Sequence, residues 1–201
     1  MAVLSNTGIR AGASAAGEEY AIKKSLTFNS ADDCYMAWTP SSAGNRKTFT
    51  WSLWYKKGES TSWTHVIGAD SSSAERQHIR WLDNDQLEIY FISSSAAKLA
   101  LIPNRKFNDE FGWQHWVLSV DTTQATAANR AKFYVNGQQV TSFSTETYPD
   151  QNFDLQINNT IQHIIGKRGY DGNSKLNAKL ADVYQIDGQA LGPESFGKFD
   201  D

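Results

Sequence analysis

The chain has very little of several features that define whole classes of protein. Its 201 residues include one cysteine, Cys34, so no internal disulfide can form and stability must come from the core and from assembly. No apolar run approaches the ~20 residues that span a bilayer. A basic segment followed by an apolar one is missing near the N-terminus, so we expect no secretory signal and synthesis in a cytoplasm. The net charge is −3, so the chain as a whole has no positive charge that would attract it to nucleic acids or to anionic membranes.

Aromatic residues, in contrast, are abundant. Seven Trp, eight Tyr and ten Phe suit the pleated, half-buried surfaces of β-sheets. Residues 49–56 alternate clearly, which predicts a strand with one aromatic and aliphatic face. That face would carry Phe49, Trp51, Leu53 and Tyr55. The opposite face would carry Thr50, Ser52, Trp54 and Lys56.

Strand patterns recur at short spacing from residue 25 onward. The further segments are 26–28, 35–38, 65–68, 78–81, 86–92, 113–120, 133–140, 161–166 and 180–186. Turn signals separate several of them, notably Asp83-Asn84-Asp85 and the hairpin dipeptide Asn136-Gly137. We find no convincing amphipathic helix and no repeat of fixed period. The sequence therefore predicts an all-β fold, an antiparallel two-sheet jelly-roll sandwich.

The last predicted strand is followed by a turn and by residues that end the strand. Alternation over 180–186 predicts that Leu180, Tyr184 and Ile186 share one face, with Ala181 and Val183 on the other. Asp187-Gly188 then indicates a turn, and Leu191-Gly192-Pro193 ends the strand.

The first 24 residues differ in composition from the rest. Small residues dominate positions 11–17 and no periodicity holds. Such a segment is either a flexible tail or an arm that orders by docking on a partner or on a neighbouring copy. In the second case the apolar residues Val3, Leu4 and Ile9 are the candidate anchors. We therefore divide the chain into an extended N-terminal attachment arm, 1–24, and a sandwich domain, 25–201.

Four segments in order carry a resemblance to a known fold. They read FTWSLWYK (49–56), WQHWV (113–117), FYVNG (133–137) and LADVYQI (180–186). Together they resemble the laminin-G-like, concanavalin-A-like sandwich over residues 25–197. Three further segments, 39–48, 121–130 and 186–191, look like parts of virion proteins of tailed bacteriophages. The resemblance implies a tail fibre, head fibre or capsid decoration, and it carries over no catalytic residues.

Enzymatic activity is not expected. Glycanases of this fold need two carboxylates flanking one glycosidic bond. The sequence has no Glu-x-Asp-x-x-Glu cluster, and Glu88, the only Glu inside a clear predicted strand, has Tyr90 as its same-face neighbour. A non-enzymatic protein is the prediction.

No metal site or other cofactor is predicted either. The four histidines, His65, His78, His115 and His163, fall in separate segments, and none pairs at a metal-ligand spacing. We expect a structural role for His115. Calcium is possible in this fold, but no specific loop supports it. The acidic loop residues are Asp83, Asp85, Asp150, Asp154 and Asp171; Asp83-Asn84-Asp85 is better explained as a hairpin turn.

Glycan binding would require exposed aromatic residues beside polar groups on loops. Trp63, Tyr148 and Tyr170 are the candidates by position. The alternative for each is ordinary loop packing, because burying an aromatic ring is favourable.

The resemblance and the arm lead to one functional hypothesis and two alternatives. The hypothesis is a structural protein of the virion, a capsid decoration or fibre component. It would dock through its arm on other virion proteins, associate with its own copies and present a lectin-like sandwich outward. The alternatives are a tail-fibre module that binds a host surface glycan, and a free lectin-like protein.

Overall fold

The computed structural model describes residues 21–58, 63–107 and 112–197. Strands are the main regular structure of these ranges, and no α-helix occurs within them. The first strands are β1 (Leu26–Phe28), β2 (Met36–Trp38), β3 (Thr48–Lys57), β4 (Thr64–Asp70), β5 (Arg76–Trp81), β6 (Leu87–Ser93) and β7 (Ala96–Pro103). The remaining strands are β8 (Gln114–Asp121), β9 (Ala131–Val135), β10 (Gln138–Gln139), β11 (Phe143–Thr147), β12 (His163–Ile165) and β13 (Ala178–Asp187). Two short 3-10 helices, η1 (Ala127–Asn129) and η2 (Pro193–Ser195), complete the set.

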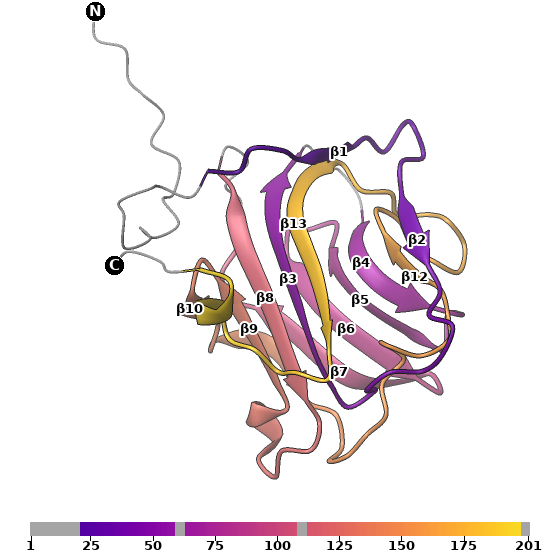
Figure 1. Cartoon of the computed structure of the whole chain (residues 1–201), viewed down its shortest axis with the longest axis vertical. Coiled ribbons are helices and arrows are strands. Elements are labelled where there is room, and N and C mark those ends of the chain that lie inside the picture. Colours follow the sequence, from indigo (N-terminus) through magenta and orange to yellow (C-terminus); the bar gives the residue numbers. More distant parts are fainter. Residues whose placement is uncertain (1–20, 59–62, 108–111, 198–201) are drawn as a thin grey trace, which may run out of the picture.

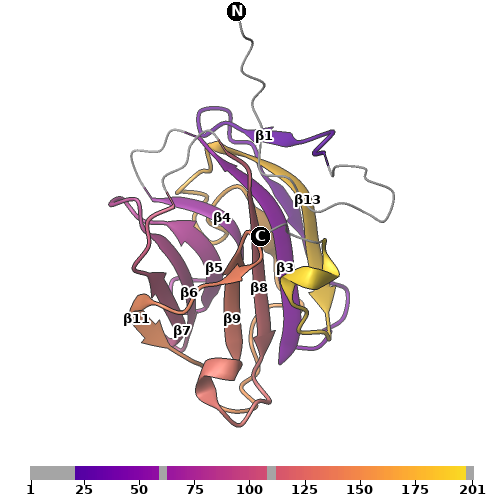
Figure 2. The same ribbon diagram turned by 90° about the vertical axis from the view of Figure 1, so that its left-hand side faces the viewer.

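The strands form two antiparallel sheets packed face to face (Figures 1 and 2). One sheet has six strands in the order β1-β13-β3-β8-β9-β10. The other has seven in the order β11-β7-β6-β5-β4-β12-β2. The prediction of an all-β, antiparallel two-sheet sandwich is confirmed.

Aromatic side chains from both sheets fill the space between them. The alternation predicted for β3 is confirmed, since Phe49, Trp51, Leu53 and Tyr55 all lie in the core. Tyr55 stacks on Trp116 of β8 with ring centroids 4.3 Å apart. Burial of such large rings is the dominant favourable term in forming this sandwich.

The two predicted hairpin turns are also confirmed. Asn136 and Gly137 have positive φ angles of 52° and 79°, as a two-residue type I′ turn requires, and they connect β9 to β10. Asp83-Asn84-Asp85 connects β5 to β6, with Asp85 at a φ of 61°. Asn and Asp tolerate this left-handed conformation better than most residues do.

The predicted faces of β13 are wrong. The pairing of β13 with β3 shifts register between Ala181 and Tyr184, and Asp182 there has a φ of 45°. A β-bulge of this kind inserts an extra residue and reverses the alternation beyond it. Leu180 therefore points into the core, whereas Tyr184 is half exposed on the outside and Val183 packs against the core instead.

The predicted attachment arm falls largely outside the described residues, which begin at residue 21. Val3, Leu4 and Ile9 lie there, so the docking role of the arm and the domain boundary at residue 24 stay predictions. Within the described ranges, no helix is long and apolar enough to cross a membrane.

Candidate functional site on the outer face of the seven-stranded sheet

Polar side chains of β4 and β5 gather on the face of the seven-stranded sheet that points away from the core. Ile79 and Trp81 of β5 pack inward, so alternation places His78 and Arg80 on the outer face. Cross-strand pairing sets Arg80 opposite His65 and His78 opposite Gly68. A Cβ on Gly68 would lie 2.9 Å from the Cβ of His78, so the glycine leaves room for the imidazole.

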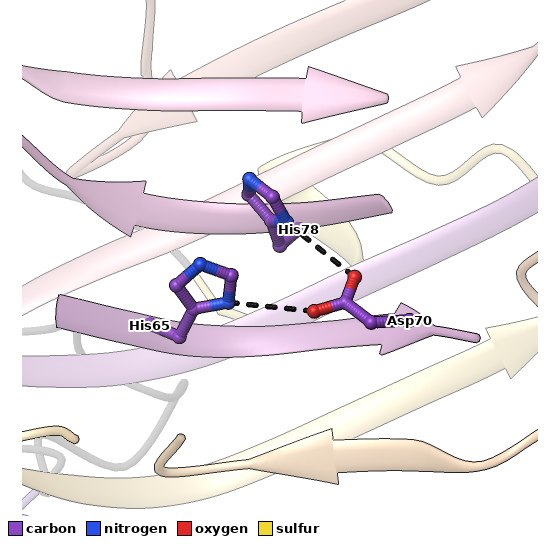
Figure 3. Close-up of side chains that lie close together, drawn as sticks. All are labelled: His65, Asp70 and His78. Atoms are coloured by element: carbon purple, nitrogen blue, oxygen red, sulfur yellow. Dashed lines mark hydrogen bonds and ion pairs between the residues drawn. The ribbon is translucent and has the colours of Figure 1, made fainter. Parts of the chain in front are cut away.

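His65, Asp70 and His78 form a compact group on this face (Figure 3). The Nδ1 atom of His78 lies 3.4 Å from one carboxylate oxygen of Asp70, and the Nδ1 atom of His65 lies 3.6 Å from the other. The two imidazole centroids are 4.1 Å apart. All three side chains are buried.

Burial controls the protonation of this group. It lowers the pKa of His65 and of His78 well below the usual 6.5, and the positive charge of Arg80 acts on both in the same direction. Burial raises the pKa of the Asp70 carboxyl. Both imidazoles are therefore neutral at pH 7, with a lone pair on one ring nitrogen.

The loop between β12 and β13, residues 166–177, covers this group. Its Gly169 N–H donates to Asp70 at 3.3 Å. Its Ser174 carbonyl accepts a hydrogen bond of 2.8 Å from the backbone N–H of His65. The loop thereby buries the histidines and brings Arg168 to the same face.

A pocket of about 530 Å³ lies beside the covered group. Its lining consists of Trp63, Arg76, Arg80, Arg168, Asn173 and Ser174. The Arg80 guanidinium lies 4.3 Å from the centroid of the Trp63 ring, a cation–π contact. We call this the arginine pocket.

Two of the three guanidinium groups have an acidic partner. Arg80 donates to Glu88 of the neighbouring strand β6, and Arg168 donates to Asp171 within its own loop. The bond from Arg168 also lowers the pKa of Asp171 to about 2. Nε of Arg76 is buried and has no hydrogen-bond partner among the described residues. The pocket therefore brings together three guanidinium groups, of which Arg76 has no ion-pair partner among the described residues.

The three predicted glycan-binding aromatics are not brought together. Trp63 lines the arginine pocket, and Tyr170 lies next to it, with the Arg168 guanidinium 4.9 Å from its ring centroid. Tyr148 follows β11 at the far edge of the sheet, where its hydroxyl donates to Glu146 at 2.7 Å.

Three of the acidic residues considered for calcium have ion-pair partners. Asp85 accepts from Lys57 at 2.8 Å, Asp150 lies 3.7 Å from the ammonium of Lys98, and Asp171 accepts from Arg168. The histidine–aspartate group was missed because His65 and His78 are separated by twelve residues and a turn. The spacing of His65 from Asp70 gave no signal either, since a register shift between His65 and Ile67 changes the alternation of β4.

His115 occupies the outer face of the other sheet. Its Nε2 atom lies 2.9 Å from the Ser52 hydroxyl, and its ring packs against Trp54 and Phe196. Burial lowers the pKa of His115 to about 4. The imidazole is thus neutral and enclosed under ordinary conditions.

Comparison with known families identifies the fold family. A family model described as the concanavalin A-like lectin/glucanases superfamily matches residues 30–194. The match spans most of the chain, so the chain belongs to this superfamily. Comparison with curated proteins gives no match.

Solved structures of several kinds share the fold at low sequence identity. A heptameric pentraxin of Limulus polyphemus is 12% identical with a TM-score of 0.51; the alignment covers 75% of this chain and 68% of the pentraxin. The NanB sialidase of Streptococcus pneumoniae is 14% identical with a TM-score of 0.57, and 88% of this chain matches 27% of that enzyme. A Bacteroides ovatus protein, for which carbohydrate binding has been suggested, is 15% identical with a TM-score of 0.53. The alignment covers 80% of this chain and 42% of the Bacteroides protein. These likenesses show a lectin-like sandwich fold.

Proposed function

We propose that this member of the concanavalin A-like lectin/glucanases superfamily is a non-enzymatic binding module that holds an acidic glycan in its arginine pocket. The observation that carries the proposal is the meeting of three guanidinium groups and one indole in a single pocket. Arginine suits the recognition of carboxylate and sulfate groups because its planar donors can bind two oxygens at once.

The Arg76 side chain supports an anionic ligand. It lines the pocket, and its positive charge has no ion-pair partner among the described residues. Trp63 is partly exposed at the rim, where its ring can cover an apolar face of a sugar. The carbohydrate binding suggested for the Bacteroides ovatus protein favours the same class of ligand.

The pairing of the nearby carboxylates supports binding over hydrolysis. Hydrolysis of a glycoside needs one carboxyl group as acid and a second as base or nucleophile. Beside this pocket, Glu88 is held by Arg80 and Asp171 by Arg168. The Arg168 guanidinium lowers the pKa of Asp171, which makes that carboxyl a poor proton donor.

A glycan array tests the proposal. We expect sialylated, sulfated or uronate-containing glycans to bind and their neutral counterparts to bind much more weakly, with affinity falling as salt is raised. Trp63→Ala and Arg168→Gln should each lose most of the binding. Tyr148→Ala, on a residue at the far edge of the sheet, is the matched control and should keep it. Equal binding of neutral and acidic glycans would contradict the proposal.

A second candidate function is the virion role implied by the sequence resemblance. It is favoured by an apolar groove of about 740 Å³ between the edge strands β1 and β2, close to where the described chain begins. Leu26 and Met36, about half exposed, line the groove with Phe28, Trp38 and Leu180. We propose that the groove receives the arm of a neighbouring copy, anchored by Val3, Leu4 and Ile9, and so links copies within a phage particle.

Deletion of residues 1–20 tests this second candidate. We expect the intact chain to form oligomers and to copurify with particles, and the truncated chain to be monomeric and absent from them. Light scattering and mass spectrometry of purified particles measure the two properties. Unchanged oligomers and unchanged incorporation would contradict a role for the arm.

A further inference from the structure

Within the described residues, His65, Asp70 and His78 are the group whose ligand atoms converge as those of a metal site do. One nitrogen of each histidine and one oxygen of Asp70 lie within 4.8 Å of one another. The group comes from two adjacent strands of a rigid sheet, which fixes the backbone positions of all three residues. Sites built on strands hold their geometry better than sites built on loops.

The distances within the group are long for hydrogen bonds and close to the spacing of ligands around a shared ion. An N–H···O hydrogen bond has its heavy atoms about 2.7–3.2 Å apart. The two histidine–aspartate distances are 3.4 and 3.6 Å. Ligands at about 2.0–2.1 Å from a tetrahedral zinc ion lie roughly 3.3–3.5 Å from one another. Each of the two distances is close to one edge of such a tetrahedron, and a small rotation of the Asp70 carboxylate, whose two oxygens they reach, would let one oxygen serve both histidines.

The histidines also carry ring nitrogens that nothing in the described structure satisfies. Both nitrogens of His65 and Nε2 of His78 are buried and have no hydrogen-bond partner among the described residues. The two side chains are 1% and 0% exposed, so bulk water does not compensate for them. Buried polar atoms without partners are uncommon and call for a specific explanation.

We propose that His65, Asp70 and His78 bind a zinc ion through the Nδ1 atoms of the two histidines and one carboxylate oxygen. Imidazole nitrogens combined with one carboxylate suit a first-row transition metal, whereas calcium and magnesium prefer sites made of oxygen alone. Three protein ligands would leave the fourth position of a tetrahedral ion open.

The charge and the hydrogen bonds of Asp70 agree with this assignment. Asp70 supplies one negative charge. Its carboxylate also accepts hydrogen bonds from the backbone N–H groups of Gln77 and Gly169, and these bonds orient it toward the histidines.

Metal analysis of the intact, tag-free chain tests the proposal. After removal of metal with a chelator, zinc is titrated by calorimetry and counted by mass spectrometry, and cobalt(II) is added as a spectroscopic probe. We expect one zinc per chain, a rise in unfolding temperature with zinc, and the intense visible absorption of cobalt in a four-coordinate site. No stoichiometric zinc, or only the weak absorption of six-coordinate cobalt, would overturn the proposal.

Substitutions assign the ion to these residues. His65→Gln, His78→Gln and Asp70→Asn should each weaken zinc binding by about 100-fold or more. His115→Gln removes a buried histidine of the other sheet and should leave the affinity unchanged. Loss of binding in the control, or its retention in all three ligand variants, would place the ion elsewhere. Circular dichroism verifies the fold of each variant; if a ligand variant does not fold, cobalt absorption of the unaltered chain still decides the coordination.

Discussion

At the scale of single residues, His115 shows how burial tunes the chemistry of a polar side chain. The imidazole lies between Ser52 and two aromatic rings, 2% exposed, and its pKa falls to about 4. In the unfolded chain the same group titrates near 6.5. Between these values the unfolded state binds more protons than the folded state, so stability falls as the pH falls.

Replacing His115 should therefore reduce the acid sensitivity of the fold. The difference of about 2.5 pH units between the two pKa values corresponds to about 3 kcal/mol lost between pH 6.5 and pH 4. Over this range we expect the free energy of unfolding of the unaltered chain to fall by about 3 kcal/mol more than that of the His115→Gln variant. Urea unfolding at a series of pH values measures it. Tyr148→Phe is the control, and parallel curves for His115→Gln and the unaltered chain would contradict the prediction.

At the scale of elements, local alternation predicted regular strands and failed where the strand geometry was broken. β3 pairs continuously with β8, and its inward and outward residues could be assigned from sequence. β13 carries a bulge at Asp182, which costs backbone strain and has no clear sequence signal, so its faces were assigned wrongly. β7, with Leu99 and Leu101 in the core, was missed although its alternation was present.

The loop after β12 provides a matched test of backbone geometry. Gly166 has a φ of +100°, and a Cβ there would lie 2.6 Å from the Phe28 ring and 2.8 Å from the Cys34 carbonyl oxygen. Gly172 has a φ of +72° with nothing within 4 Å of such a Cβ. An alanine at position 166 would therefore be destabilised both by its positive φ angle and by the clash of its Cβ. An alanine at position 172 would be destabilised by its positive φ angle alone.

We expect Gly172→Ala to lower the free energy of unfolding by about 1 kcal/mol and Gly166→Ala to lower it by clearly more, about 3 kcal/mol. Chemical denaturation of the two variants side by side measures the difference. Equal losses would mean that Phe28 and the segment around Cys34 move aside without cost.

At the scale of the whole molecule, the proposed zinc site and the arginine pocket are joined by one loop. Gly169 donates to Asp70, and Arg168, the residue before it, lines the pocket. A zinc ion adds positive charge beneath a pocket that we propose to hold an anion. Binding at each site should therefore favour binding at the other, and to the same extent.

We expect zinc to tighten the binding of an acidic oligosaccharide by about fivefold or more. Calorimetry with and without zinc, at fixed ionic strength, measures the coupling. Asp70→Asn should abolish the effect of zinc while retaining binding of the oligosaccharide in the metal-free state. Identical affinities with and without zinc would mean that the two sites act independently.

The sequence by itself determined the properties that depend on neighbours along the chain. Alternation over 49–56 established a strand with an aromatic and aliphatic inner face, the Asn136-Gly137 dipeptide established a hairpin, and the repetition of such patterns established a two-sheet sandwich. These features follow from the two-residue period of a strand and from the backbone angles that each turn residue tolerates.

Only the tertiary structure decided which polar residues meet. His65 and His78 become neighbours through the register of β4 with β5, and Arg168 reaches them because the loop after β12 folds over the sheet from some 90 residues further along the chain. Register and loop placement depend on the packing of the whole sandwich, since shifting a strand by one residue would exchange its inner and outer faces. The site is thus a consequence of the assembled sheet, and no local pattern encodes it.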